Sequence, residues 1–233
     1  MSAQDLKLSV VMPVYNERRT ILPVLQIVES VPVRKEIIIV DDGSSDGSSE
    51  LIREFAAAHS DVRVIFHEKN RGKGCAVRTG IQAATGDAII IQDADMEYDP
   101  MDYVPLLAAL ERNGVNVIYG SRFMGKKGVT AGWHRLVNYT LTLFVNLLYG
   151  ASLTDMETCY KLFRTRTLKE LHLKSEGFEM EVELTAKILR SKQRIIEIPV
   201  SYKGRSYHEG KKIGWRDGIK AVASIFYYRF SSG

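Results

Sequence analysis

Short apolar runs alternate with amphipathic stretches through the first half of the chain. Runs of strand length, rich in Val and Ile, predict β-strands at 8–14, 36–40, 62–66, 88–91 and 115–119. The stretches between them space their apolar residues three and four apart, which predicts helices at 20–30, 51–59, 74–84 and 104–112. This alternation predicts an α/β fold with a Rossmann-like, doubly wound, mainly parallel sheet flanked by helices.

The second half of the chain is more helical. Its pattern of apolar and polar residues predicts a long amphipathic helix at 133–149, a helix at 178–190, a strand at 194–200 and a last amphipathic helix at 215–230. The apolar stripe of the last helix consists of Ile219, Val222, Ala223, Phe226 and Phe230. Without an internal repeat or linker, we expect one domain over 1–233, with a ligand-binding half at 1–122, a second half at 123–200 and a basic, amphipathic tail at 201–233.

Composition narrows the class of protein only slightly. The chain of 233 residues is 45% hydrophobic and 26% charged, as is usual for globular domains. Its two cysteines, Cys75 and Cys159, lie too far apart for a CxxC motif and favour a reducing, cytoplasmic setting. No apolar run resembles a signal peptide or reaches the roughly 18 residues of a membrane span.

Charge is distributed unevenly along the chain. The net charge is +4, yet residues 201–233 hold seven basic and two acidic residues, a net +5, which leaves −1 for residues 1–200. A basic tail indicates an anionic partner such as phosphate or a membrane surface, although a solvated basic face is the plainer interpretation. Aromatic residues are not interleaved with these bases as in RNA-binding modules, so we expect no nucleic acid partner.

Polar motifs follow several of the predicted strands, where parallel α/β sheets bind their ligands. These motifs are Asn16-Glu17, Asp41-Asp42-Gly43, Asp93-Ala94-Asp95 and Gly120-Ser121-Arg122. Carboxylates gathered at one edge repel one another, and a cation would offset that cost. Asp93, Asp95 and Glu97 follow a strand at two-residue spacing, and Mg²⁺ takes one or two carboxylates together with phosphate oxygens. The alternative is a solvated turn before Pro100.

Two glycine-containing loops add candidate binding groups. The segment 41–47 follows a strand and opens a helix, and an acid there can accept hydrogen bonds from a base or a ribose. Arg71-Gly72-Lys73-Gly74 precedes a helix and can receive an anion, although a plain helix-start turn fits equally well.

In this order, the motifs resemble the family 2 glycosyltransferases of GT-A fold. The resemblance rests on 11–17, 40–47, 72–74, 93–95 and 120–122, and continues through 155–164, 177–181 and 198–202 to the basic loop 205–216. More specifically, the chain is similar to dolichyl-phosphate and polyprenyl-phosphate mannosyl- or glucosyltransferases. The resemblance covers nearly the whole chain. The chain ends at Gly233 without the C-terminal membrane spans that some members of the family carry.

The resemblance implies a role for individual residues. Those expected to bind the nucleotide sugar are Pro13, Tyr15, Glu17, Val40, Asp42, Lys73, Asp93, Ala94, Asp95, Arg205 and Lys211. Asp95 and Glu97 are expected to hold a divalent cation, Mg²⁺ or Mn²⁺, although the family often has Gln in place of Glu97. Arg122 and Arg135 are expected to meet an acceptor phosphate. Asp93, Asp95, Arg122 and Arg205 form the expected catalytic set.

The implied reaction is an inverting transfer of a hexose from a nucleotide diphosphate sugar to polyprenyl or dolichyl phosphate, with mannose as the leading candidate for the hexose. An ionised phosphate acceptor needs little base catalysis, whereas a sugar hydroxyl needs a base, for which Asp155 or Glu157 is a candidate and loop capping the alternative. The alternatives are a UDP-sugar donor, a sugar hydroxyl acceptor, or a non-catalytic nucleotide- or RNA-binding subunit. The lipid acceptor implies peripheral contact with the cytoplasmic face of a membrane through the amphipathic helices, and leaves room for a membrane-spanning partner subunit.

Overall fold

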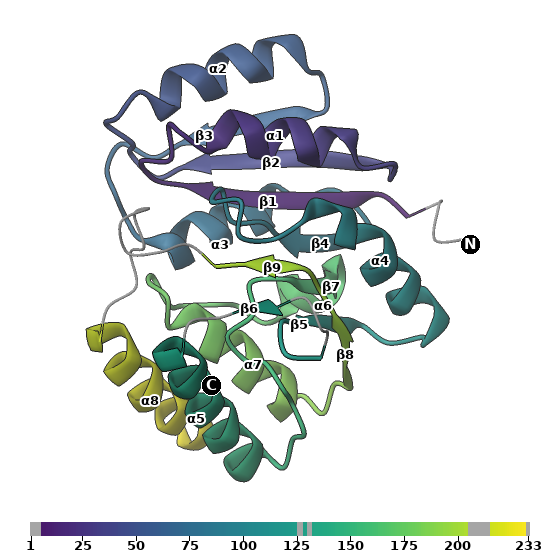
Figure 1. Cartoon of the computed structure of the whole chain (residues 1–233), viewed down its shortest axis with the longest axis vertical. Coiled ribbons are helices and arrows are strands. Elements are labelled where there is room, and N and C mark those ends of the chain that lie inside the picture. The colour runs from purple at the N-terminus through teal and green to yellow at the C-terminus, as the bar shows by residue number, and fades with distance from the viewer. Residues whose placement is uncertain (1–5, 125–127, 130–131, 205–214, 232–233) are drawn as a thin grey trace.

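A computed structural model describes residues 6–124, 128–129, 132–204 and 215–231 of the chain, without the side chains of 128–129, 132–134, 215–217 and 219. A seven-stranded sheet forms its centre (Figure 1) in the order β3-β2-β1-β4-β7-β5-β8. The strands are β1 (Leu8–Val14), β2 (Lys35–Asp41), β3 (Val62–Phe66), β4 (Ala88–Ile91), β5 (Val117–Ser121), β7 (Lys161–Arg164) and β8 (Ile195–Pro199). A small second sheet pairs β6 (Gly128–Val129) with β9 (Tyr202–Lys203).

Helices connect and cover these strands. They are α1 (Ile21–Ser30), α2 (Ser48–Ala58), α3 (Lys73–Ala83), α4 (Tyr103–Arg112), α5 (Gly132–Tyr149), α6 (Thr165–Glu170), α7 (Met180–Arg190) and α8 (Trp215–Phe230), with a short 3₁₀ helix, η1 (Pro100–Asp102), before α4. Figure 1 shows α1 and α3 on opposite sides of β1 and β2, while α5, α7 and α8 gather below the sheet. The predicted α/β fold with a doubly wound, mainly parallel sheet is confirmed.

The strands that carry the polar motifs are buried on both faces. In β1 the residues Leu8, Val10, Val11 and Met12 are fully buried, and so are all four residues of β4. Such continuous apolar runs are typical of parallel strands that are covered by helices on both sides. In register, Pro13 lies beside Val40, and Val11 lies beside Ile91, so β2 and β4 flank β1 on its two sides.

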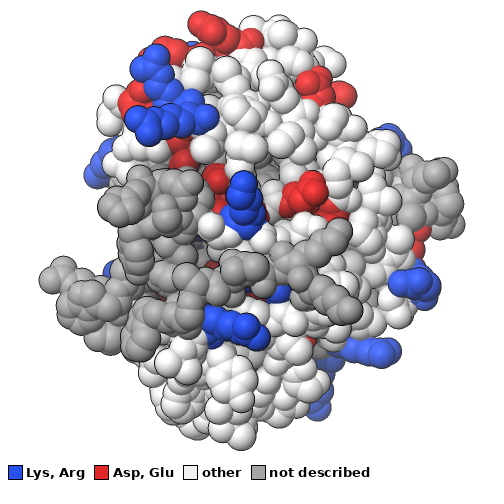
Figure 2. All heavy atoms as spheres, in the orientation of Figure 1, with Lys and Arg blue, Asp and Glu red and all other residues white. Residues whose placement is uncertain are grey.

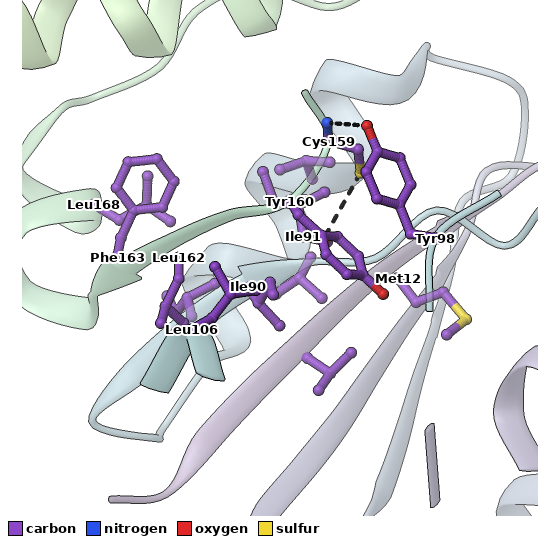
Figure 3. Close-up of a cluster of buried hydrophobic side chains, with 14 of the residues drawn as sticks. Met12, Ile90, Ile91, Tyr98, Leu106, Cys159, Tyr160, Leu162, Phe163 and Leu168 are labelled. Atoms are coloured by element: carbon purple, nitrogen blue, oxygen red, sulfur yellow. Dashed lines mark hydrogen bonds between the residues drawn. The ribbon is translucent and has the colours of Figure 1, made fainter. Parts of the chain in front are cut away.

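Strand β7 was not predicted from the sequence. This strand lies antiparallel between β4 and β5, with Ile90 opposite Leu162 and Ile118 also opposite Leu162. Its short sequence contains Lys161, which does not fit an apolar strand, yet the Lys161 side chain is fully buried. The tertiary fold therefore inserts a strand that local apolar patterning did not reveal. Figure 3 shows Leu162 and Phe163 among the surrounding core side chains.

The two long amphipathic helices pack differently from the predicted stripes. In α8 the buried positions are Ala221 and Ile225, whereas Phe226 and Phe230 of the predicted stripe are exposed. In α5 Leu141 and Val145 are buried, whereas Leu136, Leu143, Phe144 and Leu147 are exposed. The two helices are joined by bonds from the Tyr149 hydroxyl to the Ile225 carbonyl (2.9 Å) and from Arg229 Nε to the Leu148 carbonyl (2.8 Å). Within the described residues, no helix is long and apolar enough to span a membrane.

Candidate active site

The carboxyl ends of β2, β1 and β4 bring the first predicted binding residues to one edge of the sheet. Pro13 and Val40 lie side by side in the register of β1 and β2, and Tyr15 and Asp42 follow directly after these two strands. Asp93 follows β4, on the other side of β1. Parallel pairing therefore assembles groups that are up to 80 positions apart in the chain.

Asp42 fastens the loop that leads into α3. Its carboxylate accepts hydrogen bonds from the backbone N–H groups of Arg71 (3.0 Å) and Gly72 (2.8 Å). It also lies 2.7 Å from Nδ1 of His67, a residue that the sequence analysis missed. Gly72 has a φ of 94°, and a side chain there would meet the Glu176 carbonyl, so this position requires glycine. The Asp42 carboxylate thus holds the loop that presents Lys73.

Asp93 begins a chain of half-buried and buried charges. Lys73 Nζ lies 2.7 Å from Asp93 Oδ1 and 3.7 Å from Glu181 Oε1 on α7, and Lys161 pairs with the other oxygen of Glu181. Burial opposes the charged form of Lys73, yet Asp93 and Glu181 raise its pKa well above the ordinary value. Lys73 therefore links Asp93 to Glu181 on α7, and Glu181 is in turn paired with Lys161. No role was predicted from the sequence for Lys161 or Glu181.

Asp95 and Glu97 lie on the turn that follows Asp93. The backbone N–H of Glu97 donates to Asp95 Oδ1 (3.2 Å), and Met96 between them has a φ of 59°. Glu97 Oε2 accepts a hydrogen bond from the hydroxyl of Tyr202 (2.8 Å). Among the described residues, no group of three or more His, Cys, Asp or Glu side chains is arranged around a metal position. Two neighbouring carboxylates nevertheless suit a divalent cation that takes its remaining ligands from a diphosphate.

Arg122 is held by Asp155 at the end of β5. Its Nε and Nη2 each donate to Asp155 at 2.7 Å, and Asn138 on α5 donates to the same carboxylate at 2.7 Å. Burial opposes the charged form of Asp155, but the Arg122 guanidinium holds its pKa below the ordinary value. This environment keeps Asp155 ionised and already occupied by hydrogen-bond donors.

An aromatic residue connects the two predicted cations for the acceptor phosphate. The guanidinium groups of Arg122 and Arg135 each lie 5.7 Å from the centre of the Phe123 ring. Arg122 also lies 5.1 Å from the centre of the Tyr202 ring, whose hydroxyl contacts Glu97. Tyr202 therefore connects the Asp95–Glu97 turn to the cluster of Arg122, Phe123 and Arg135.

The remaining predicted residues are placed only in part. Glu17 follows β1 and accepts a hydrogen bond from the Thr20 hydroxyl (2.9 Å), and Ala94 is buried between the two aspartates. Arg205 and Lys211 lie outside the described residues. Figure 2 shows acidic and basic side chains next to one another across the middle of the face that it presents.

Comparison with known proteins decides the family. The sequence model of Glycosyl transferase family 2 matches residues 9–171, which is most of the chain. The chain belongs to glycosyl transferase family 2. The matched part contains nearly all of β1, the strands β2 to β5 and β7, and the loops 41–47 and 71–74. The family assignment therefore covers the sheet edge described above.

Curated family members resemble the chain over most of its length. Undecaprenyl-phosphate mannosyltransferase of Micrococcus luteus is 28% identical over 92% of this chain and 90% of its own. Polyprenol monophosphomannose synthase of Mycolicibacterium smegmatis is 28% identical over 88% of this chain and 80% of its own. Dodecaprenyl-phosphate galacturonate synthase of Rhizobium johnstonii is 28% identical over 98% of this chain and 69% of its own.

Solved structures confirm the GT-A fold. Glucosyl-3-phosphoglycerate synthase of Mycobacterium tuberculosis, solved with Mn²⁺, UDP and phosphoglyceric acid, superposes with a TM-score of 0.71 at 20% identity, over 99% of this chain and 82% of that one. A mannosyltransferase of Pyrobaculum calidifontis, solved with GDP-Man and Mn²⁺, superposes with a TM-score of 0.68 at 19% identity, over 98% of this chain and 65% of that one.

Proposed function

We propose that this family 2 glycosyltransferase moves a hexose from a nucleotide diphosphate sugar to a polyprenyl or dolichyl phosphate, with mannose as the leading candidate for the hexose. One observation carries the proposal. Tyr202 bonds to Glu97 on the predicted donor side and lies against Arg122 on the predicted acceptor side. Tyr202, from the segment that follows β8, therefore connects the predicted cation-binding carboxylate to the predicted acceptor-binding cation. The names of the curated relatives support a polyprenyl-phosphate acceptor.

The donor half offers groups for each part of a nucleotide sugar. The residues proposed to bind the base and ribose are Pro13, Tyr15, Glu17, Val40 and Asp42. Asp42 also holds the loop that precedes Lys73. Asp95 and Glu97 would hold Mg²⁺ or Mn²⁺, which supplies positive charge to the diphosphate leaving group. The cations in the crystals of structural neighbours support this assignment. Asp93 orients Lys73, whose ammonium adds positive charge beside the same turn.

The acceptor half offers cations rather than a free base. A phosphate monoester is ionised near neutral pH, so it attacks without losing a proton to the protein. Arg122 and Arg135, grouped around Phe123, would place that phosphate. Asp155 stays a candidate base, but its two oxygens already bind Arg122 and Asn138, which favours a role in positioning Arg122. Arg205 and Lys211 are proposed to add charge over the diphosphate.

A UDP-sugar donor is the second candidate. The structural neighbour with bound UDP favours it, and nothing on the described sheet edge selects guanine over uracil. Transfer to a sugar hydroxyl is the other alternative, which the occupied Asp155 carboxylate makes less favourable. The donor panel described below separates these alternatives by product.

The exposed sides of α5 and α8 support peripheral contact with a membrane. Leu147 is 73% exposed on α5, and Tyr227 and Phe230 on α8 are 62% and 74% exposed. The α5 segment contains no acidic residue, and Lys220 and Arg229 of α8 are exposed. Exposed apolar groups beside cations suit an anionic lipid surface. We place this contact on the cytoplasmic face, where a membrane-spanning partner subunit would add to it.

A product assay tests the proposed function directly. The protein is incubated with radiolabelled GDP-mannose, UDP-glucose or UDP-galacturonate, polyprenyl phosphate in vesicles, and either Mn²⁺ or a chelator. We expect labelled lipid to form with one of the three donors, and to form in the presence of Mn²⁺ but not of the chelator. A soluble glycan as the sole labelled product would favour the hydroxyl acceptor. Absence of product with every donor and acceptor would overturn the proposal.

A further inference from the structure

Glu157 lies in the loop that connects α5 to β7. Hydrogen bonds hold the residues two positions before and two positions after it. Asp155 binds Arg122, and the backbone N–H of Cys159 donates to the Tyr98 hydroxyl at 3.0 Å (Figure 3). Figure 3 also shows the Cys159 thiol bonded to the Ile91 carbonyl at the end of β4. The position of Glu157 is therefore set by the sheet edge.

One carboxyl oxygen of Glu157 is not satisfied by the described part of the protein. Its Oε1 is buried and has no hydrogen-bond partner there. The charged groups that face it are Arg122, Asp155, Lys161 and Glu181. Neither basic group donates a hydrogen bond to Glu157 Oε1, because Arg122 is paired with Asp155 and Lys161 is paired with Glu181. Native proteins satisfy nearly all buried polar atoms, so an unsatisfied carboxyl oxygen indicates a missing partner.

A second carboxyl oxygen nearby lacks a hydrogen bond as well. Oε1 of Glu181 has none in the described residues and lies 3.7 Å from Lys73 Nζ. Burial raises the pKa of Glu157 to about 7, with Glu181 and Asp155 acting in the same direction and Lys161 and Arg122 opposing them. Both oxygens are acceptors that require donors. Sugar hydroxyls are neutral donors, and the transferred sugar must lie between Asp93 and Arg122 if the proposed function holds.

We propose that Glu157 accepts hydrogen bonds from hydroxyl groups of the sugar on the donor and thereby contributes to the choice of sugar. This inference rests on the proposed function. A cation-binding role is disfavoured, because the neighbouring Arg122 and Lys161 would repel a bound cation. In this role the ionised form of Glu157 is the one that binds, because it offers acceptors only.

Binding measurements with matched ligands test the inference. Calorimetry with Mn²⁺ compares GDP with GDP-mannose and UDP with UDP-glucose, for the wild type, Glu157→Gln and the surface control Glu170→Gln. We expect Glu157→Gln to weaken binding of the nucleotide sugar about tenfold, as for one hydrogen bond to a charged group. The same variant should bind the free diphosphate within about twofold of the wild type. Glu170→Gln should match the wild type with every ligand.

Stability separates ligand binding from a structural role. Because Oε1 of Glu157 is buried without a hydrogen-bond partner among the described residues, Glu157→Gln and Glu157→Leu should keep or raise the melting temperature. Glu157→Asp should restore part of the sugar affinity. A clear fall in melting temperature together with equal weakening of diphosphate and nucleotide sugar would overturn the inference. So would unchanged affinity for the nucleotide sugar.

The pH dependence gives a second readout. Sugar binding favours the carboxylate, so the affinity for the nucleotide sugar relative to the diphosphate should rise about tenfold from pH 6 to pH 8 in the wild type. The ratio should be flat for Glu157→Gln. A ratio that falls with rising pH would mean that the protonated acid donates instead, and would overturn the inference. If the wild type binds no nucleotide at all, the proposed function fails, whereas wild-type binding that Glu157→Gln leaves unchanged contradicts Glu157 alone.

Discussion

The Arg122 guanidinium and the Asp155 carboxylate form a bidentate ion pair, in which Nε and Nη2 each lie 2.7 Å from a different carboxylate oxygen. The pair joins the end of β5 to the loop before β7, and Asn138 fixes it from α5. A fork of this kind orients the guanidinium more strictly than a single contact would. The remaining face of Arg122 lies against Tyr202 and Phe123, beside the predicted path of the acceptor phosphate.

Asp155→Asn is expected to act through Arg122 and not through lost base catalysis. The change leaves a mostly buried guanidinium without its counter-charge, which should lower the free energy of unfolding by about 3 kcal/mol in urea titrations. The KM for polyprenyl phosphate should rise about tenfold, and kcat should fall less than tenfold. Loss of a general base would instead cost roughly 100-fold or more in kcat. Asp61→Asn, at an exposed position, serves as the control.

Tyr202→Phe is expected to weaken cation binding while keeping the ring against Arg122. The variant removes the hydroxyl that bonds to Glu97 Oε2, so this carboxylate is held less firmly. The Mn²⁺ concentration for half-maximal activity should rise about tenfold, the usual effect of one hydrogen bond to a charged group. Tyr139→Phe, which removes an exposed hydroxyl on α5, should leave it unchanged. An unaltered Mn²⁺ requirement in Tyr202→Phe would contradict the assignment of Glu97.

Glu36 should make stability depend on pH in the acid range. Burial opposes its ionisation, but hydrogen bonds from Ser9, Thr85 and Lys7 lower its pKa from 4.5 to about 2. Because the folded pKa is the lower one, its stabilisation is complete above pH 5 and is lost as the pH falls toward 2. Urea titrations should show Glu36→Gln less stable than the wild type at pH 7, with the difference shrinking toward pH 3. A constant difference would contradict this linkage.

The exposed aromatic residues of α8 should govern membrane contact. Phe226→Ser with Phe230→Ser removes apolar surface that would enter the lipid interface, where one Phe side chain contributes roughly 1.5–3 kcal/mol. Sedimentation with anionic vesicles should show at least tenfold weaker binding, at an unchanged melting temperature. The control is Met101→Ser with Val104→Ser, which removes exposed apolar groups near η1. Equal binding by both double variants would contradict this surface.

Much of the fold could be predicted from the sequence because parallel strands buried on both faces carry their own signal. β1, β3 and β4 have the predicted bounds, and β2 extends the predicted strand by one residue at each end. The polar motifs beyond these strands could be located for the same reason, since parallel pairing fixes which ends meet. The predicted roles of Asp93, Asp95 and Arg122 stay predictions, but the places of these residues follow from the strands that precede them.

The tertiary structure decided what depends on partners distant in the chain. β7 exists because its backbone completes the ladder between β4 and β5, and Lys161 is tolerated there because Glu181 arrives from α7. The exposure of Phe226 and burial of Ile225 depend on how α8 meets α5, which no helical periodicity specifies. The sequence by itself determined the parallel strands β1 to β4 and the polar edge beyond them, because strand burial and motif order are local properties. Only the tertiary structure decided the pairing of Arg122 with Asp155 and of Tyr202 with Glu97, because these contacts depend on long-range packing. For the same reason it alone decided that Oε1 of Glu157 is buried without a hydrogen-bond partner among the described residues.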